Sequence, residues 1–332
     1  MNKLFKITLL FIGGLLCLCC GTNQSSDNKT LTDKQDATGS NSEIAGDSNV
    51  YRDIIYYEGR FFAIGTGGQI DQVSRAGIKT ALNSPGFNNL NCATIFNEEI
   101  IIAGDKGTIL SSNDGKVFSV EESGTDDDIN GIASKNGLIV AGTDNGIVLV
   151  SKNSRSWSSI DTDAKGNITS LAANNSFFIG VSDKGEVIKS NDGFNWQVTD
   201  YNEVYAGYNK YCFFRKIIAG LNSIVIIGHH DDGSPSVLFS TLGNVWTERL
   251  LVYDDENGIM QYLSELPNDI TYDPDRDQFV LACNGGVIFS LPTCTKCNTY
   301  TKVTNGDISA VTYADNSLAI AGDDYLISIF SF

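Results

Sequence analysis

The chain has 332 residues, of which 42% are apolar, so it contains enough hydrophobic material for a sizeable core. It carries 40 acidic and 23 basic residues, which gives a formal net charge of −17. An excess of acid this large argues against a nucleic-acid partner, which needs a basic surface, and against a protein that lies flat on anionic lipid.

The first residues have the pattern of a secretory signal. Lys3 and Lys6 begin an apolar stretch that ends at Leu18 and is too short for a typical transmembrane helix. The cysteines that close this stretch resemble the lipobox of bacterial lipoproteins. That resemblance implies that residues 1–19 are cleaved and that Cys20 is lipidated, which would anchor the protein in a membrane of the cell envelope. An ordinary cleaved signal and an uncleaved anchor are the alternatives.

Residues 20–48 form a segment of different character. They are polar, lack aromatic side chains and contain few large apolar ones. Such a segment cannot bury enough surface to offset the entropy lost on ordering. We therefore predict a disordered tether that begins with the lipidated cysteine and leads to one folded domain over residues 49–332.

The folded part of the chain repeats itself. Three consecutive units end in an aromatic residue, Phe118, Trp157 and Trp196, at intervals of 39 residues. Each unit contains short runs of Ile, Val, Leu and Phe bounded by turn residues, which is typical of strands. Seven units can be recognised, and about 38 residues with four strands is the size of one propeller blade. We expect an all-β, monomeric β-propeller of about seven four-stranded blades.

Two details of the repeat lead to further expectations. The last unit ends after its third strand, so we expect residues 43–47 to supply the fourth strand of that blade and cover its edge. Small residues recur where the second strand of a unit ends, as at Gly104 and Gly142. Glycine at these positions is expected to permit a turn with positive φ.

The turn before the last strand of a unit has the pattern Ser-x-Asp-Gly, followed by an aromatic residue. The Asp carboxylate can accept backbone N–H groups across such a turn, and the aromatic side chain packs under the blade. The pattern therefore predicts a folding element and not a catalytic site. The residues that carry it are Ser112, Asp114, Gly115, Phe118, Ser190, Asp192, Gly193 and Trp196.

These turns resemble the Asp-box (BNR-type) repeat of bacterial sialidases and related propellers. With the period and the lipobox, residues 50–332 are similar to the Asp-box propellers that include the photosystem assembly and stability factors. Sialidases of this fold bind a substrate carboxylate with an arginine trio, and the Arg-x-Pro signature of its first arginine is absent here. We therefore lean against an enzyme, with glycan binding or glycoside hydrolysis as the alternative.

Two insertions, residues 199–214 and 247–268, interrupt the repeat on either side of the fifth unit. In propellers of this kind, such connections lie on the same face as the loop between the second and third strands, here residues 228–233. All three are expected to meet in one sector, and loops carry function disproportionately. The candidate binding residues are Tyr201, Tyr205, Tyr208, Tyr211, His229, His230, Asp231 and Asp232.

Each group of candidates also has a structural interpretation. Helical spacing relates Tyr201, Tyr205, Tyr208 and Cys212, so these residues form either the buried stripe of a short helix or aromatic anchors for a ligand. His229 and His230 are adjacent and should point apart in an extended loop, which favours a solvated polar turn over a metal site. We expect no metal and no cofactor.

The cysteines outside the signal are odd in number, since three of the eight lie within it. Cys294 and Cys297 are the only close pair. A single C-x-x-C after a strand lacks the ligands of a structural zinc site, so a disulfide is favoured, with free buried thiols next.

These observations predict a non-catalytic, membrane-tethered binding scaffold outside the cytoplasm, on the periplasmic or the outer surface. Its expected partners are the membrane, through the lipid anchor, and an envelope protein or a glycan. One expected role is to assist the assembly or stability of an envelope protein complex, as the assembly factors of similar fold do.

Overall fold

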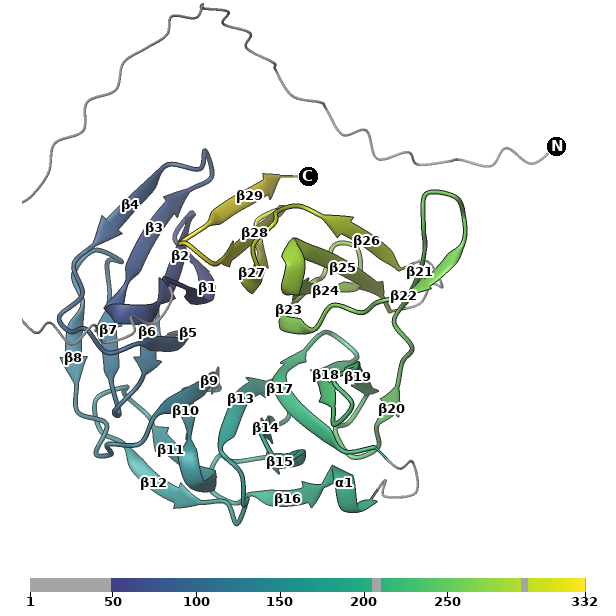
Figure 1. The fold of residues 1–332 in the computed structure, drawn as a ribbon. Helices are drawn as coiled ribbons and strands as arrows, with labels where there is room; N and C mark the ends of the chain where they lie inside the picture. The colour runs from purple at the N-terminus through teal and green to yellow at the C-terminus, as the bar shows by residue number, and fades with distance from the viewer. Residues whose placement is uncertain (1–48, 205–209, 294–297, 332) are drawn as a thin grey trace, which may run out of the picture. The chain divides into compact units, whose positions relative to one another are not determined.

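The computed structural model describes residues 49–204, 210–293 and 298–331. In this part of the chain, consecutive strands pair antiparallel into seven blades around a central axis, and the first strand of each blade lies innermost (Figure 1). The expected all-β propeller is therefore confirmed. The single α-helix of the described residues is α1 (Tyr201–Val204), and no helix there is long and apolar enough to cross a membrane.

The blades follow one another along the sequence. Blade one contains β1 (Tyr51–Tyr57), β2 (Arg60–Gly65), β3 (Ile70–Ser74) and β4 (Lys79–Leu82). Blade two contains β5 (Leu90–Phe96), β6 (Glu99–Gly104), β7 (Ile109–Ser112) and β8 (Ser119–Glu121). Blade three contains β9 (Ile129–Lys135), β10 (Leu138–Thr143), β11 (Ile147–Ser151) and β12 (Ser158–Asp161). Blade four contains β13 (Ile168–Ala173), β14 (Phe178–Ser182), β15 (Glu186–Ser190) and β16 (Gln197–Asp200).

The remaining blades are less regular. Blade five contains β17 (Cys212–Ala219), β18 (Ile224–His230), β19 (Pro235–Ser240) and β20 (Thr247–Glu248), and a separate hairpin of β21 (Val252–Asp254) and β22 (Met260–Tyr262) follows it. Blade six contains β23 (Pro267–Asp273), β24 (Gln278–Cys283), β25 (Val287–Pro292) and β26 (Thr299–Lys302). Blade seven contains β27 (Ile308–Ala314), β28 (Ser317–Gly322) and β29 (Ile327–Ser331).

The hydrophobic core is divided among the junctions between blades. Each of the seven junctions has its own cluster of buried side chains, so every blade is covered on both faces. This is why the middle strands have continuous apolar runs such as Ile100 to Ala103, all of them fully buried, and not the alternating pattern of a half-exposed sheet.

Blade seven packs against blade one and closes the ring. Val50 forms an antiparallel bridge with Asp323, and the Ser309 hydroxyl donates to the carbonyl of Tyr51. In the described residues blade seven has three strands. Residues 43–47, from which we expect the fourth strand, lie outside the described part of the chain.

The glycines at the ends of the second strands have a different role from the expected one. Neither Gly104 nor Gly142 has a positive φ; the positive values occur later in each turn, at Gly107 and Gly146. A Cβ atom on Gly104 would instead lie 2.0 Å from the carbonyl oxygen of Asn89. Glycine is needed there because the backbone of the innermost strand approaches too closely for any side chain.

The Ser-x-Asp-Gly turn of blade four is held by its own side chains. One oxygen of Asp192 accepts the backbone N–H groups of Phe194 and Asn195 at 2.9 and 2.8 Å, and the Ser190 hydroxyl accepts the N–H of Gly193 at 2.8 Å. These bonds hold the pKa of Asp192 well below its usual value. The carboxylate therefore serves as a hydrogen-bond acceptor within the turn.

The same turn also joins neighbouring blades. Gly193 has φ +80°, and a Cβ atom there would lie 2.6 Å from a methyl carbon of Leu138 in blade three. In blade two, Gly115 has φ +62° and lies in the same way against Phe62 of blade one, while Asp114 accepts two backbone N–H groups. The aromatic residues that follow pack into the cores, with Phe118 buried and Trp196 half-buried.

Candidate functional site

The three segments predicted to converge at the fifth unit line one cavity of about 660 Å³. We call this cavity the blade-five groove. It is lined by Tyr201, Lys210, Cys212, His230, Ser234, Pro235, Tyr262, Leu263 and residues 246–251. These residues come from the connection between blades four and five, the β18–β19 turn, and the chain from β20 to β22. The predicted meeting of the three segments is thus observed in the described residues.

The outer wall of the groove is apolar and exposed. Leu250 is 70% exposed and Tyr262 is 63% exposed, and the neighbouring Met260 is 57% exposed. They belong to the chain that leaves β20 and to the β21–β22 hairpin, which blade six supports through a stacked pair, Tyr253 and Tyr300, with ring centroids 4.5 Å apart. Neither Leu250 nor Tyr262 was a candidate from the sequence, because single apolar residues in an insertion give no signal of where they face.

The floor of the groove is a hydrogen-bonded chain of three side chains. The Cys212 Sγ lies 3.3 Å from Nδ1 of His230, and Nε2 of the same ring lies 2.6 Å from Oε1 of Glu248. Burial raises the pKa of the Cys212 thiol to about 11, so the thiol stays protonated. The His230 ring thus bridges the thiol of Cys212 and the carboxylate of Glu248. This arrangement gives a polar floor, with Glu248 at its exposed end, and not an activated thiolate.

The two adjacent histidines point apart, as expected, but they do not form the solvated turn favoured for them. Both belong to strand β18. His230 is buried in the floor of the groove, whereas His229 is half-exposed and stacks on Phe213 with ring centroids 5.3 Å apart. Among the described residues, no group of three His, Cys, Asp or Glu side chains is placed to hold a metal ion.

The acidic residues of the β18–β19 turn lie at the rim. Asp231 and Asp232 are exposed, and Lys210 pairs with Asp232 at 2.8 Å. Lys210, together with the hydroxyl and N–H of Ser234, lowers the pKa of Asp232 well below its usual value. The rim therefore presents an exposed ion pair beside an apolar wall.

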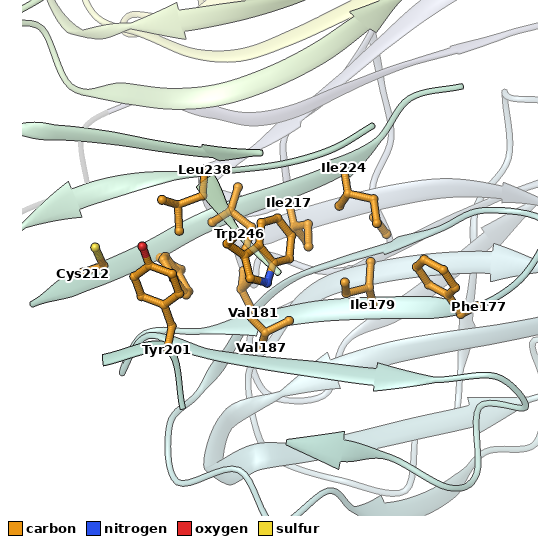
Figure 2. Close-up of a cluster of buried hydrophobic side chains, with 13 residues drawn as sticks. Phe177, Ile179, Val181, Val187, Tyr201, Cys212, Ile217, Ile224, Leu238 and Trp246 are labelled. Atoms are coloured by element: carbon orange, nitrogen blue, oxygen red, sulfur yellow. The ribbon is translucent and has the colours of Figure 1, made fainter. Parts of the chain in front are cut away.

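The predicted tyrosines divide into different environments. Tyr201 is buried in α1, edge-on to Phe214 with centroids 5.5 Å apart, and Tyr211 is 62% exposed. Figure 2 shows Tyr201 and Cys212 at one end of the buried cluster between blades four and five. Cys212 is the first residue of strand β17, so it does not continue a helical stripe from Tyr201. Tyr205 and Tyr208 lie outside the described residues.

The remaining sequence candidates are cysteines. Cys20, the expected lipid attachment site, and the pair Cys294 and Cys297, the expected disulfide, all lie outside the described residues. The three cysteines that the structure does describe, at positions 92, 212 and 283, are buried free thiols.

Comparison with known proteins supports the architecture. No family model matches the chain, and no curated protein matches it in sequence. Among solved structures, YCF48 bound to a D1 peptide is similar, with a TM-score of 0.64 and 14% identity over 86% of this chain and 93% of that one. The WD40 propeller domain of Doa1 has a TM-score of 0.64 and 13% identity over 86% of this chain and 94% of that one. The Cps50 (Swd1) propeller of Myceliophteria thermophila has a TM-score of 0.63 and 8% identity, over 85% and 97% of the two chains. Identities this low establish the fold alone.

Proposed function

We propose that this protein is a non-catalytic binding scaffold and that the blade-five groove binds a segment of a partner protein. The observation that carries the proposal is the exposed apolar wall of Leu250 and Tyr262, with Met260 beside it, over a polar floor. Protein interfaces combine central aromatic or aliphatic anchors with a polar rim, and the ion pair of Lys210 and Asp232 lies at the rim here.

Two further findings support the proposed scaffold. The similar propeller YCF48 was solved with a peptide of D1 bound. The carboxylate-centred turns at residues 112–118 and 190–196 agree with the inferred relation to Asp-box propellers, in which such turns are folding elements. The proposed role is therefore recognition, with assistance to the assembly or stability of an envelope complex as its purpose.

The location of the scaffold rests on the first residues of the chain. We propose that Cys20 is lipidated and that residues 20–48 tether the propeller to a membrane outside the cytoplasm. In the cells that produce it, the Cys20→Ser variant should lose labelling by a fatty-acid analogue and leave the membrane fraction. Unchanged labelling of this variant would place the lipid on another residue, and absence of labelling in the unaltered protein would rule lipidation out.

The groove is best tested by photocrosslinking in the same cells. A photoreactive phenylalanine analogue replaces Tyr262 in the full-length protein, and the control carries the same analogue at Phe87, which is 92% exposed and distant in sequence from the groove. A defined envelope protein should be crosslinked from position 262 and not from 87, and Leu250→Asp should abolish the crosslink. Equal capture from both positions would contradict the proposal.

The crosslinking result also addresses the alternative function. If position 262 captures no protein, the purified protein should be tested on a glycan array and with chromogenic glycosides. A glycan signal that Tyr262→Ala abolishes would move the conclusion from a protein partner to a sugar ligand. Hydrolysis of a glycoside would show an enzyme.

A further inference from the structure

The hairpin at the outer wall of the blade-five groove has one free edge. Its two strands, β21 and β22, form a sheet of their own, and no other described strand pairs with either. The outer side of β21 lies against blade six, where the side-chain amide of Asn298 donates to the carbonyl of Val252 at 2.7 Å, next to the stacked tyrosines (Figure 1). The edge along β22 is therefore the one turned away from blade six, on the side of the groove that Tyr262 lines.

The register of the hairpin shows which main-chain groups this edge presents. The N–H of Leu263 donates to the carbonyl of Leu251 across the hairpin at 2.8 Å. In an antiparallel pair, hydrogen-bonded positions alternate with non-hydrogen-bonded ones. Gln261 is therefore also a hydrogen-bonded position, whereas Met260 and Tyr262 are not. These two residues direct their N–H and C=O groups outward, away from β21.

The outward groups have no partner in the described part of the chain. No described residue forms a hydrogen bond with the main-chain N–H or C=O of Met260 or Tyr262. A row of unpaired N–H and C=O groups is a template for another strand, and proteins usually protect such an edge with charged residues or proline. Residues 259–262 are Ile, Met, Gln and Tyr, so this edge has neither protection. It is open to the addition of a strand.

The side chains of the two outward residues add an apolar surface to the free edge. Successive residues of a strand point to opposite faces. Gln261 shares a face with its cross-strand neighbour Tyr253, which packs on blade six, and its side-chain amide donates to Asp255 at 3.1 Å. Met260 and Tyr262 point to the opposite face, where they are 57% and 63% exposed. A segment along this edge would meet main-chain partners and apolar side chains at the same two residues.

We propose that the partner of the blade-five groove binds in an extended conformation, as a strand that adds to β22. This inference rests on the proposed function and specifies how the groove recognises its partner. The main chain of the partner segment pairs with Met260 and Tyr262, and its alternate side chains are apolar and contact Tyr262 and Leu250, which both line the groove. A helical segment cannot pair in this way, because its own N–H and C=O groups are already bonded within the helix.

Hydrogen exchange in the purified protein tests the free edge in the absence of a partner. Amide exchange followed by NMR should be at least about tenfold slower at Leu263, whose N–H is bonded within the hairpin, than at Met260 and Tyr262. Exchange at Met260 and Tyr262 as slow as at Leu263 would overturn the proposal, because the edge would then already be paired, either within the chain or with a second copy of it.

The pairing itself is tested with two substitutions at Met260, each combined with the photoreactive analogue at position 262. Met260→Ala and Met260→Pro both remove the side chain, but only proline also removes the outward N–H and places a ring at the edge. Neither change removes a hydrogen bond of the hairpin, because position 260 is not a hydrogen-bonded one. Capture of the partner protein should be at least about tenfold lower in Met260→Pro than in Met260→Ala, since a strand loses a main-chain hydrogen bond and is blocked by the ring.

The outcomes separate this inference from the proposed function. Equal capture by the two Met260 variants would overturn strand addition and leave the groove as a protein-binding site. No capture from position 262 in the unaltered background would overturn both, and a crosslink to a second copy of this chain would assign the edge to self-association instead.

A second measurement decides if the proline variant loses its hairpin, which rapid exchange of the Leu263 amide would reveal. A synthetic peptide with the sequence of the captured segment is then added to the unaltered protein. It should slow amide exchange at Met260 at least about tenfold, because that N–H becomes bonded to the added strand. Unchanged exchange at Met260 in the presence of bound peptide would overturn the proposal.

Discussion

Truncation of one buried aromatic residue tests whether the cores between blades carry the stability of the ring. Phe178 is 0% exposed in the cluster between blades three and four. Its ring centroid lies 6.4 Å from that of Trp196 and 4.8 Å from the ammonium of Lys135. Phe178→Ala therefore removes contacts in two blades at once. Because both blades are held by their other neighbours, the cavity can collapse only partly.

The expected loss of stability follows from this geometry. Truncating a buried phenylalanine to alanine costs about 3–5 kcal/mol, and we expect the upper half of that range. For a domain of this size the melting temperature falls by roughly 2 °C for each kcal/mol, which gives a decrease of about 8–10 °C. Calorimetry and urea unfolding of the purified protein measure both quantities.

A matched control separates the loss of core contacts from the effect of the Phe→Ala substitution itself. Phe87 is 92% exposed, so Phe87→Ala makes the same substitution without removing core contacts and should change stability by less than about 0.5 kcal/mol. If the two variants differ by less than about 1 kcal/mol, the reasoning that places the stability in the junctions between blades is wrong.

Four further results are expected. Gly193→Ala should lower the free energy of unfolding, measured in urea, by at least about 1 kcal/mol more than Gly124→Ala does. Both glycines have φ +80°, but only at Gly193 would a Cβ atom lie against a neighbouring blade. Equal losses in the two variants would contradict this reasoning. Burial raises the pKa of Asp269 to about 6, so a carbon NMR titration should have its midpoint there and not near 4. Since the unfolded carboxyl ionises near pH 4 while the folded one stays protonated, this group's contribution to stability should fall as the pH rises from about 4 to about 6. Deletion of residues 41–49 should sharply lower the melting temperature if they complete blade seven, and an unchanged value would refute that idea. Iodoacetamide at pH 8 should label Cys212 at least about tenfold more slowly in the folded protein than in urea, as measured by peptide mass spectrometry.

The position of the candidate site follows from the repeat, but its chemistry does not. The 39-residue period and the two insertions predict that residues 199–214, 228–233 and 247–268 meet in one sector, because connections of the same kind lie on the same face of every blade. The period does not show which side chains of an irregular insertion face the groove. For this reason the sequence selected Tyr201, which is buried, and passed over Leu250.

Local sequence determined the features that depend on neighbours along the chain. The apolar runs determined the strands, the Ser-x-Asp-Gly turns supplied their own hydrogen bonds, and the number of units determined the number of blades. Only the tertiary structure decided the contacts that depend on register. Cys212 meets His230 because β17 and β18 pair in that register. Register depends on the hydrophobic patterns of both paired strands and on the turn that joins them, and a bulge changes that pairing locally, so neither can be read from one strand alone.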